Sequence, residues 1–209
     1  WSLQPVLLNE GILPADGQAH GVTLGRLDQY CGWLLKKKGW TTVGGPVTDK
    51  KAIILGAPHT SVMDFVISYL FYTAFDAQKC KVMIKKEFFF WPFGPLLRSL
   101  GGVPVDRSNA STLVKSLISQ MENEDSFILA IAPEGTRKPA RKWKTGYHLI
   151  AKEVGCPVYL GYFDWGTKRV SVGEKVELTD DARADTERIQ AIYEQMHLTG
   201  KHPDGYVTH

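Results

Sequence analysis

The chain has 209 residues, of which 44% are hydrophobic, so its length and composition suit one globular domain with a sizeable core and exclude a mostly disordered chain. Its 25 basic and 22 acidic residues leave a formal net charge of +3, which is too balanced to indicate a nucleic-acid partner. Cys31, Cys80 and Cys156 lie far apart without a metal-ligand pattern, which argues against a metal site or a disulfide framework and favours a reducing, cytoplasmic location.

The N-terminal part of the chain divides into an arm and a helix. Residues 1–22 contain two prolines and three glycines among few periodic positions, which predicts an irregular arm ahead of a single domain over residues 23–209. Apolar residues recur at helical spacing over residues 23–38, and three lysines end this run, which predicts an amphipathic helix. The helix either packs on the core or lies at a membrane surface, because Trp33 and Trp40 beside lysines are typical of interfacial segments.

A histidine and a carboxylate follow the first predicted strand, residues 51–56. His59 and Asp64 are five positions apart, about 140° on a regular helix, so they converge only if His59 lies in the loop and Asp64 in the first helical turn. A carboxylate that orients a histidine to take a proton from a substrate hydroxyl is the His–Asp half of a catalytic triad. The alternative is structural, because Ser61-x-x-Asp64 before an apolar run is also a capping box at a helix start.

A buried helix, a strand and an aromatic-rich stretch come next. Residues 61–75 are apolar nearly all round, which predicts a helix buried on most sides but too short, against the ~18 apolar residues required, to span a membrane. Residues 81–84 predict a strand. Residues 85–97 then hold five aromatics in six positions and two prolines, which predict irregular backbone. This apolar surface is either core filler or an exposed lip that receives an acyl chain or contacts lipid.

Arg107 follows the next predicted strand, which two glycines introduce at Gly101 and Gly102. Ser108 or Asn109 is then predicted to cap a helix that runs to about residue 121. Ligands of open α/β sheets bind outside the carboxyl ends of the strands, where helix N-termini favour anions. Arg107 is therefore a candidate phosphate ligand, and an ion pair with the adjacent acid at position 106 is the ordinary alternative.

A second candidate phosphate site follows the continuous apolar run 126–132, which predicts a strand covered on both faces. Next come Glu134, Gly135, Thr136 and Arg137, in which glycine allows close backbone approach, threonine offers a hydroxyl and arginine offers a forked donor for phosphate oxygens. Four further cations follow before residue 145. They form either an ordinary solvated loop or a positive surface that attracts an acidic substrate or carrier protein.

The remaining periodic segments complete the predicted fold. They are a helix over 146–154, strands over 158–163 and 169–172, and a helix over 182–197. Because strands alternate with helices, we predict a single α/β domain with a mostly parallel central sheet flanked by helices.

Three stretches occur together in a fixed order: His59-x-Ser61-x-x-Asp64, Gly102-Val103-Pro104-Val105-Asp106-Arg107, and Pro133-Glu134-Gly135-Thr136-Arg137, followed by Cys156-Pro157-Val158. At these separations they resemble the glycerolipid acyltransferase family, whose best-known members are the 1-acylglycerol-3-phosphate acyltransferases. The resemblance covers about residues 50–165. The short chain looks most like the small bacterial branch of that family.

The resemblance implies an enzyme that transfers a fatty acyl group from an acyl thioester, on coenzyme A or acyl carrier protein, to the hydroxyl of a lysophosphatidate-like glycerolipid. It implies no further cofactor and no metal, and work at a membrane surface, peripherally at the inner face of the cell membrane. The roles that it implies are as follows: His59 general base, Asp64 its orienting partner, Arg107 and Arg137 ligands of the acceptor phosphate, and Glu134, Gly135 and Thr136 the residues that shape that site.

Other functions fit the same residues. The acceptor could be another lyso-lipid or amphiphile such as a lyso-aminolipid, whose carboxylate would use the same arginines. The chain could instead be a non-catalytic module that binds lipid or an acyl carrier, or a thioester hydrolase in which water replaces the acceptor alcohol. Product analysis with and without acceptor separates these activities.

Overall fold

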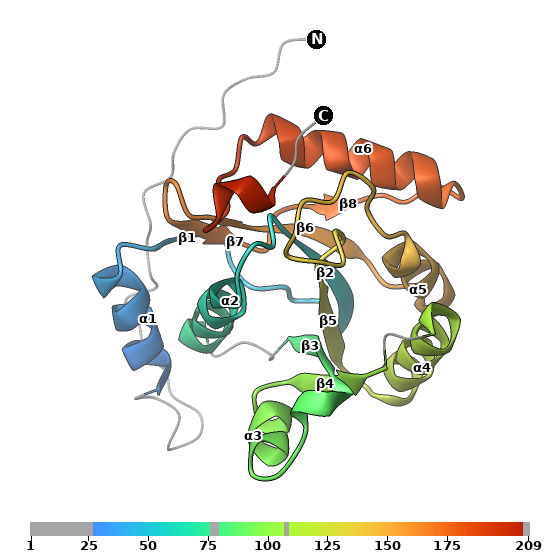
Figure 1. Ribbon diagram of the computed structural model, residues 1–209, viewed down its shortest axis with the longest axis horizontal. Helices are drawn as coiled ribbons and strands as arrows, with labels where there is room; N and C mark the ends of the chain where they lie inside the picture. Colours follow the sequence, from blue (N-terminus) through green and yellow to red (C-terminus); the bar gives the residue numbers. More distant parts are fainter. Residues whose placement is uncertain (1–26, 76–79, 107–108, 207–209) are drawn as a thin grey trace.

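A central sheet of eight strands with helices on both faces organises the protein (Figure 1). The structure is a computed structural model and describes residues 27–75, 80–106 and 109–206. The predicted arm, residues 1–22, and Arg107 lie outside the described residues. The strands are β1 (Thr41–Val43), β2 (Lys51–Ala57), β3 (Lys81–Lys85), β4 (Gly102–Val105), β5 (Phe127–Ile131), β6 (Val158–Asp164), β7 (Arg169–Ser171) and β8 (Lys175–Val176).

The sheet is mostly parallel, which confirms the predicted fold class, a single α/β domain. Its order is β1-β7-β6-β2-β5-β3-β4, with β8 paired to β6. Strand β2 lies between β5 and β6 and is parallel to both, and β1–β7, β3–β4 and β3–β5 are parallel pairs as well. Strand β6 pairs antiparallel with β7 and β8. The central strands β2 and β5 are continuous apolar runs because both of their faces are covered.

Helices cover the two faces of the sheet in separate groups (Figure 1). α1 (Leu27–Lys37) and α2 (Met63–Ala74) pack on the face of the sheet that carries the side chains of Ala52 and Ile54. α4 (Ala110–Asn123), α5 (Gly146–Val154) and α6 (Ala182–Gln195) pack on the other face, where Ile53 and Leu55 point. This division follows from the alternation of side chains along a strand. α3 (Phe93–Ser99) follows the short 3-10 helix η1 (Lys86–Phe88), and a second one, η2 (Pro203–Gly205), lies near the C-terminus.

Several local predictions can be compared with these elements. α5 has the predicted bounds, and Asn109 caps α4 by accepting the Thr112 N–H at 3.0 Å. The prediction of irregular backbone over 85–97 was wrong in part, because η1 and α3 form there. Pro92 is the N-cap of α3 and Pro95 lies in its first turn, where no backbone donor is needed. Strands β1 and β8 were missed because two or three residues show no measurable periodicity.

Helix α1 presents part of its apolar stripe to the outside. The predicted helix began at residue 23, and residues 23–26 lie outside the described residues. Cys31 and Leu35 are buried, whereas Leu27, Tyr30 and Trp33 are 43%, 55% and 50% exposed. The helix therefore packs on the core and also exposes aromatic side chains. Within the described ranges, no helix is long and apolar enough to cross a membrane.

Strand β3 separates from β5 soon after it begins. The two strands pair at Lys81↔Leu129 and Val82↔Ala130, whereas β3 pairs with β4 from Val82 to Lys85. The second half of β3, together with β4 and α3, therefore diverges from the centre of the sheet. This divergence leaves room between the two parts of the sheet at the carboxyl end of β5.

Candidate active site

His59 and Asp64 meet at the carboxyl end of β2. His59 lies in the loop before α2 and Asp64 in the first turn of that helix, which is the arrangement that their spacing required. The Nδ1 atom of His59 is 3.2 Å from Oδ2 of Asp64, and the two side chains are 27% and 1% exposed. Because a carboxylate only accepts, the neutral ring carries its proton on Nδ1 and leaves Nε2 available as a base.

Three N–H groups besides the imidazole hold the Asp64 carboxylate. Its Oδ2 accepts the backbone N–H of Thr60 at 3.0 Å and of Ser61 at 2.9 Å, and its Oδ1 accepts the indole Nε1–H of Trp165 at 2.7 Å. The hydroxyl oxygen of Ser61 in turn accepts the N–H of Met63 at 3.2 Å. This is half of a capping box, because the Asp64 carboxylate accepts the Ser61 N–H, whereas the Ser61 hydroxyl accepts the N–H of Met63 instead of that of Asp64 and the N-cap residue Val62 makes no side-chain cap bond. The Asp64 carboxylate therefore orients His59 and also holds the turn before α2, and the capping-box alternative is met only in part.

Trp165 was not among the residues that the sequence singled out. It lies between β6 and β7, 101 positions from Asp64, and packs edge-on against Trp40 with ring centroids 4.9 Å apart. The Lys201 ammonium lies 5.0 Å from its ring. A single tryptophan after a strand carries no local signal of such a contact. Only the adjacency of β6 and β2 in the sheet brings the indole to the end of β2.

The Glu134 side chain holds the loop that carries His59. The backbone N–H of His59 donates to the Glu134 carboxyl, with the two oxygens 3.0 Å and 3.2 Å from the nitrogen. Burial raises the pKa of Glu134 to about 8, the negative Asp64 adds to this effect, and the His59 N–H opposes it. Near neutral pH this carboxyl is mostly protonated, so it supports the loop without adding a full negative charge.

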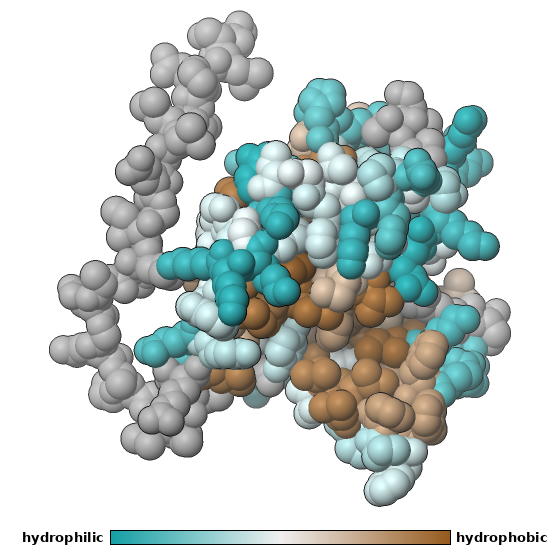
Figure 2. Space-filling view, turned by 60° about the vertical axis from the view of Figure 1, so that its left-hand side comes forward, coloured by the Kyte–Doolittle hydropathy of each residue, from teal (hydrophilic) through white to brown (hydrophobic). Residues whose placement is uncertain are grey.

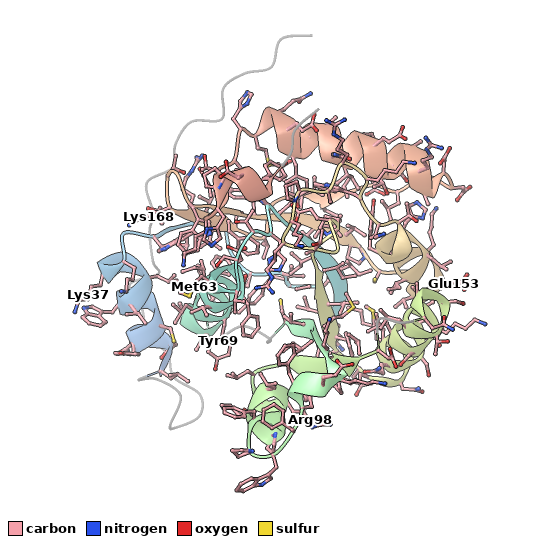
Figure 3. The ribbon with its side chains drawn as sticks, in the orientation of Figure 1. Lys37, Met63, Tyr69, Arg98, Glu153 and Lys168 are labelled. Carbon is pink, nitrogen blue, oxygen red and sulfur yellow. The ribbon has the colours of Figure 1, made fainter. Side chains whose placement is uncertain are left out.

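A large apolar cavity opens beside His59. It has a volume of about 1730 Å³, above the ~300–1000 Å³ of common small-molecule pockets. Helices α2, α3, α4 and α5 and the strands around the β3–β5 divergence contribute to its wall. Tyr69 of α2 and Glu153 of α5, which both line it, lie on opposite sides of the central strands (Figure 3). The cavity therefore passes from one face of the sheet to the other.

The Gly135–Arg137 segment also lines this cavity, together with Lys144. Gly135 has φ +69°, a left-handed conformation that favours glycine, and a Cβ there would lie 3.2 Å from the Lys144 side chain. The Thr136 hydroxyl accepts the backbone N–H of Lys138 at 3.1 Å. Arg137 is exposed and shares the cavity wall with His59. The structure thus brings together His59, Asp64 and this segment, while Arg107 lies outside the residues it describes.

Comparison with protein families decides the broader identity. The family model named Acyltransferase matches residues 40–159, more than half of the chain, and this match includes the His59–Asp64 and Glu134–Arg137 segments. The chain belongs to the acyltransferase family. This finding confirms the resemblance seen in the sequence motifs.

A solved structure resembles this acyltransferase over most of its length. It is the crystal structure of the 1-acyl-sn-glycerophosphate (LPA) acyltransferase PlsC from Thermotoga maritima, with 20% sequence identity and a TM-score of 0.53. The match covers 85% of this chain and 81% of that chain. At this identity the likeness shows a shared fold. A search of curated proteins found no match.

Replacing Trp165 with phenylalanine tests how the acyltransferase holds its Asp64 carboxylate. Phenylalanine keeps most of the packing on Trp40 but removes the 2.7 Å bond to Oδ1. The Asp64 carboxylate then has one partner fewer and holds the His59 ring less firmly in its productive orientation, so turnover is expected to fall about tenfold. Trp40→Phe is the control, because it changes the same packing without touching the bond. Equal turnover in Trp165→Phe and Trp40→Phe would contradict this prediction.

Replacing Glu134 with glutamine tests the buried, protonated carboxyl. Its pKa rises from 4.5 to about 8 on folding, so between these values the folded protein holds a proton that the unfolded chain releases. The contribution of Glu134 to the free energy of unfolding therefore falls as pH rises through this window. Glutamine keeps an acceptor for the His59 N–H but does not titrate. Urea unfolding should show Glu134→Gln gaining stability relative to the unchanged protein between about pH 5 and about pH 8. Parallel pH dependences would show that Glu134 does not titrate in this range.

Proposed function

We propose that this acyltransferase moves a fatty acyl group from an acyl thioester to the hydroxyl of a lysophosphatidate-like glycerolipid, with His59 as general base. The observation that carries the proposal is the placement of the His59–Asp64 pair on the wall of a large apolar cavity. An apolar cavity suits acyl chains, and a neutral imidazole beside it suits removal of a hydroxyl proton.

The reaction then needs one base and no acyl-enzyme. The acceptor hydroxyl attacks the thioester carbonyl carbon while its proton passes to Nε2 of His59. The tetrahedral intermediate collapses, the C–S bond breaks, and the imidazolium returns the proton to the departing thiolate. The products are an ester and a free thiol, and His59 is neutral again. Asp64 orients the ring throughout and stabilises the transient imidazolium through Nδ1–H.

Cations around the cavity support an anionic acceptor and an acidic donor. Arg137 and Lys144 line the cavity near Gly135, so they are proposed to bind the acceptor phosphate, and we assign Arg107 the same role from its sequence motif. The exposed cations at 138, 141 and 142 suit either coenzyme A or acyl carrier protein. We place the reaction at the cytoplasmic face of the cell membrane, without a further cofactor.

A matrix of donors and acceptors tests the proposed function. Purified protein is mixed with acyl-coenzyme A or acyl carrier protein, and with lysophosphatidate, a lyso-aminolipid or no acceptor. Free thiol and acylated product are both measured. Thiol release that requires lysophosphatidate, with phosphatidate as product, is the expected result. Acylation of the lyso-aminolipid alone would reassign the acceptor, and thiol release that does not depend on any acceptor would indicate a hydrolase.

A further inference from the structure

An aromatic lobe projects from the carboxyl end of β3. It comprises residues 86–99, which form η1, a turn and α3. Gly94 is the one buried residue in it, so nearly all of its side chains face outward. Five large apolar side chains are more than half exposed: Phe88 56%, Phe90 56%, Trp91 84%, Phe93 52% and Leu96 54%. Figure 2 shows the lobe as the brown protrusion at the bottom of the view, beside a hollow in the surface.

The backbone of the aromatic lobe is hydrogen-bonded within itself, so its fold holds these side chains outward. The N–H of Gly94 donates to the carbonyl of Phe90 at 2.8 Å, and the N–H of Phe89 donates to that of Lys86 at 3.0 Å. A Cβ on Gly94 would lie 2.7 Å from the Phe89 carbonyl oxygen. Exposed apolar side chains on ordered backbone mark a contact surface, because folding alone gives no reason to hold them away from the core.

The aromatic lobe is also continuous with the cavity. Phe88, Phe90 and Phe93 line the cavity on one side and are exposed on the other. A protein seated on this lobe would cover that edge of the cavity. A lipid bilayer would instead extend the apolar cavity wall to the environment in which long-chain amphiphiles reside.

The charges around the aromatic lobe fit a bilayer with anionic head groups. Lys85 and Arg98 are exposed cations, and Lys86 forms an ion pair with Asp106 at 2.5 Å. Glu87 and Asp106 are exposed acids of the group, so the three cations leave a small positive excess. The Arg98 guanidinium lies 5.0 Å from the ring of Phe89, and Figure 3 places Arg98 on α3. Tryptophan beside cations is the composition that prefers the boundary between head groups and acyl chains.

We propose that the aromatic lobe docks onto the surface of an anionic lipid bilayer, with Trp91 and Leu96 entering the boundary between head groups and acyl chains. The docked lobe places the cavity at the membrane, so that an amphiphile passes from the bilayer along Phe88, Phe90 and Phe93 toward His59. This route rests on the proposed function, whereas the docking itself does not.

Vesicle binding tests the docking without any substrate. The full chain is sedimented with phosphatidylglycerol vesicles and with phosphatidylcholine vesicles. Trp91→Ser combined with Leu96→Ser is the test variant, because neither side chain lines the cavity. Trp33→Ser with Tyr30→Ser on α1 is the matched control, because those side chains are 50% and 55% exposed elsewhere. The lobe variant is expected to lose about tenfold or more in binding to phosphatidylglycerol vesicles while the control retains it.

Several results would overturn the proposal. Binding of the lobe variant equal to that of the unchanged protein would do so, and so would an equal loss in the α1 control. A dimer seen without lipid that dissociates in the lobe variant would assign the lobe to a second copy of the chain.

Turnover of a short-chain acceptor in free solution should be the same for the lobe variant and the unchanged protein. Absence of acyl transfer in every protein would count against the proposed function and leave the vesicle result standing as the test of docking.

Discussion

Replacing His59 with alanine is expected to lower acyl transfer by about 10²- to 10⁴-fold with the fold intact. The loss follows from the position of the imidazole, which is 3.2 Å from Asp64 and lines the cavity. The fold should survive because the His59 side chain is partly exposed and the bond to Glu134 uses the backbone N–H. The measurement is the rate of thiol release with acyl thioester and lysophosphatidate, alongside a thermal unfolding curve.

The chain offers a matched control in its second His–Asp pair. The Nε2 atom of His148 is 3.1 Å from Oδ2 of Asp185, and both side chains are buried away from the cavity. His148→Ala leaves a buried carboxylate with one partner fewer, so it should lower the unfolding temperature and keep turnover at low temperature. His59→Ala should show the opposite pattern. Unchanged turnover in His59→Ala would exclude this histidine as the base.

The sequence was most informative where one local rule set the structure. The continuous apolar run before Pro133 predicted a central strand, and β5 is covered on both faces. The side chain of Asn109 predicted a helix start, and it accepts the expected backbone N–H. The five-position spacing of His59 and Asp64 predicted a loop and a first helical turn. For Asn109 and for the His59–Asp64 pair the determining contacts lie within five residues of each other, and for β5 the apolar run itself is local.

The parts of the site that sequence reasoning missed depend on contacts between distant segments. Trp165 reaches Asp64 across 101 positions, Glu134 reaches the His59 backbone across 75, and the N–H of His202 donates to the Thr60 hydroxyl across 142. No local pattern encodes these pairs, because the strand order of the sheet creates them. The same holds for the cavity, which exists because β3 leaves β5 after two paired residues. The sequence of a short segment predicts the conformation of that segment better than it predicts which distant segments will contact it.

Replacing Asp64 with asparagine is expected to lower turnover by about 10²- to 10⁴-fold, because the variant cannot stabilise the imidazolium that forms during acyl transfer. Four donors face the native carboxylate, three at Oδ2 and one at Oδ1. An amide has one acceptor oxygen and one donor nitrogen, so in either orientation its NH₂ meets an N–H group. The better orientation keeps the oxygen toward Thr60 and Ser61 and turns the NH₂ toward Trp165. Steady-state kinetics of Asp64→Asn measures the loss.

In Asp64→Asn, the amide NH₂ faces the indole N–H of Trp165, and both are donors. A double-mutant cycle of these two residues therefore tests the role of Asp64. In the unchanged protein, Trp165→Phe removes a hydrogen bond to a charged group and should cost about 1.5–3 kcal/mol of unfolding free energy. In the Asp64→Asn background the same substitution removes a donor that opposes the amide, so its cost should fall to near zero. Turnover should stay low in the double variant, because restored packing does not return the negative charge. A Trp165→Phe cost that is equal in both backgrounds would show that the indole does not hold this carboxylate, and recovered turnover in the double variant would show that the charge of Asp64 is not what His59 needs.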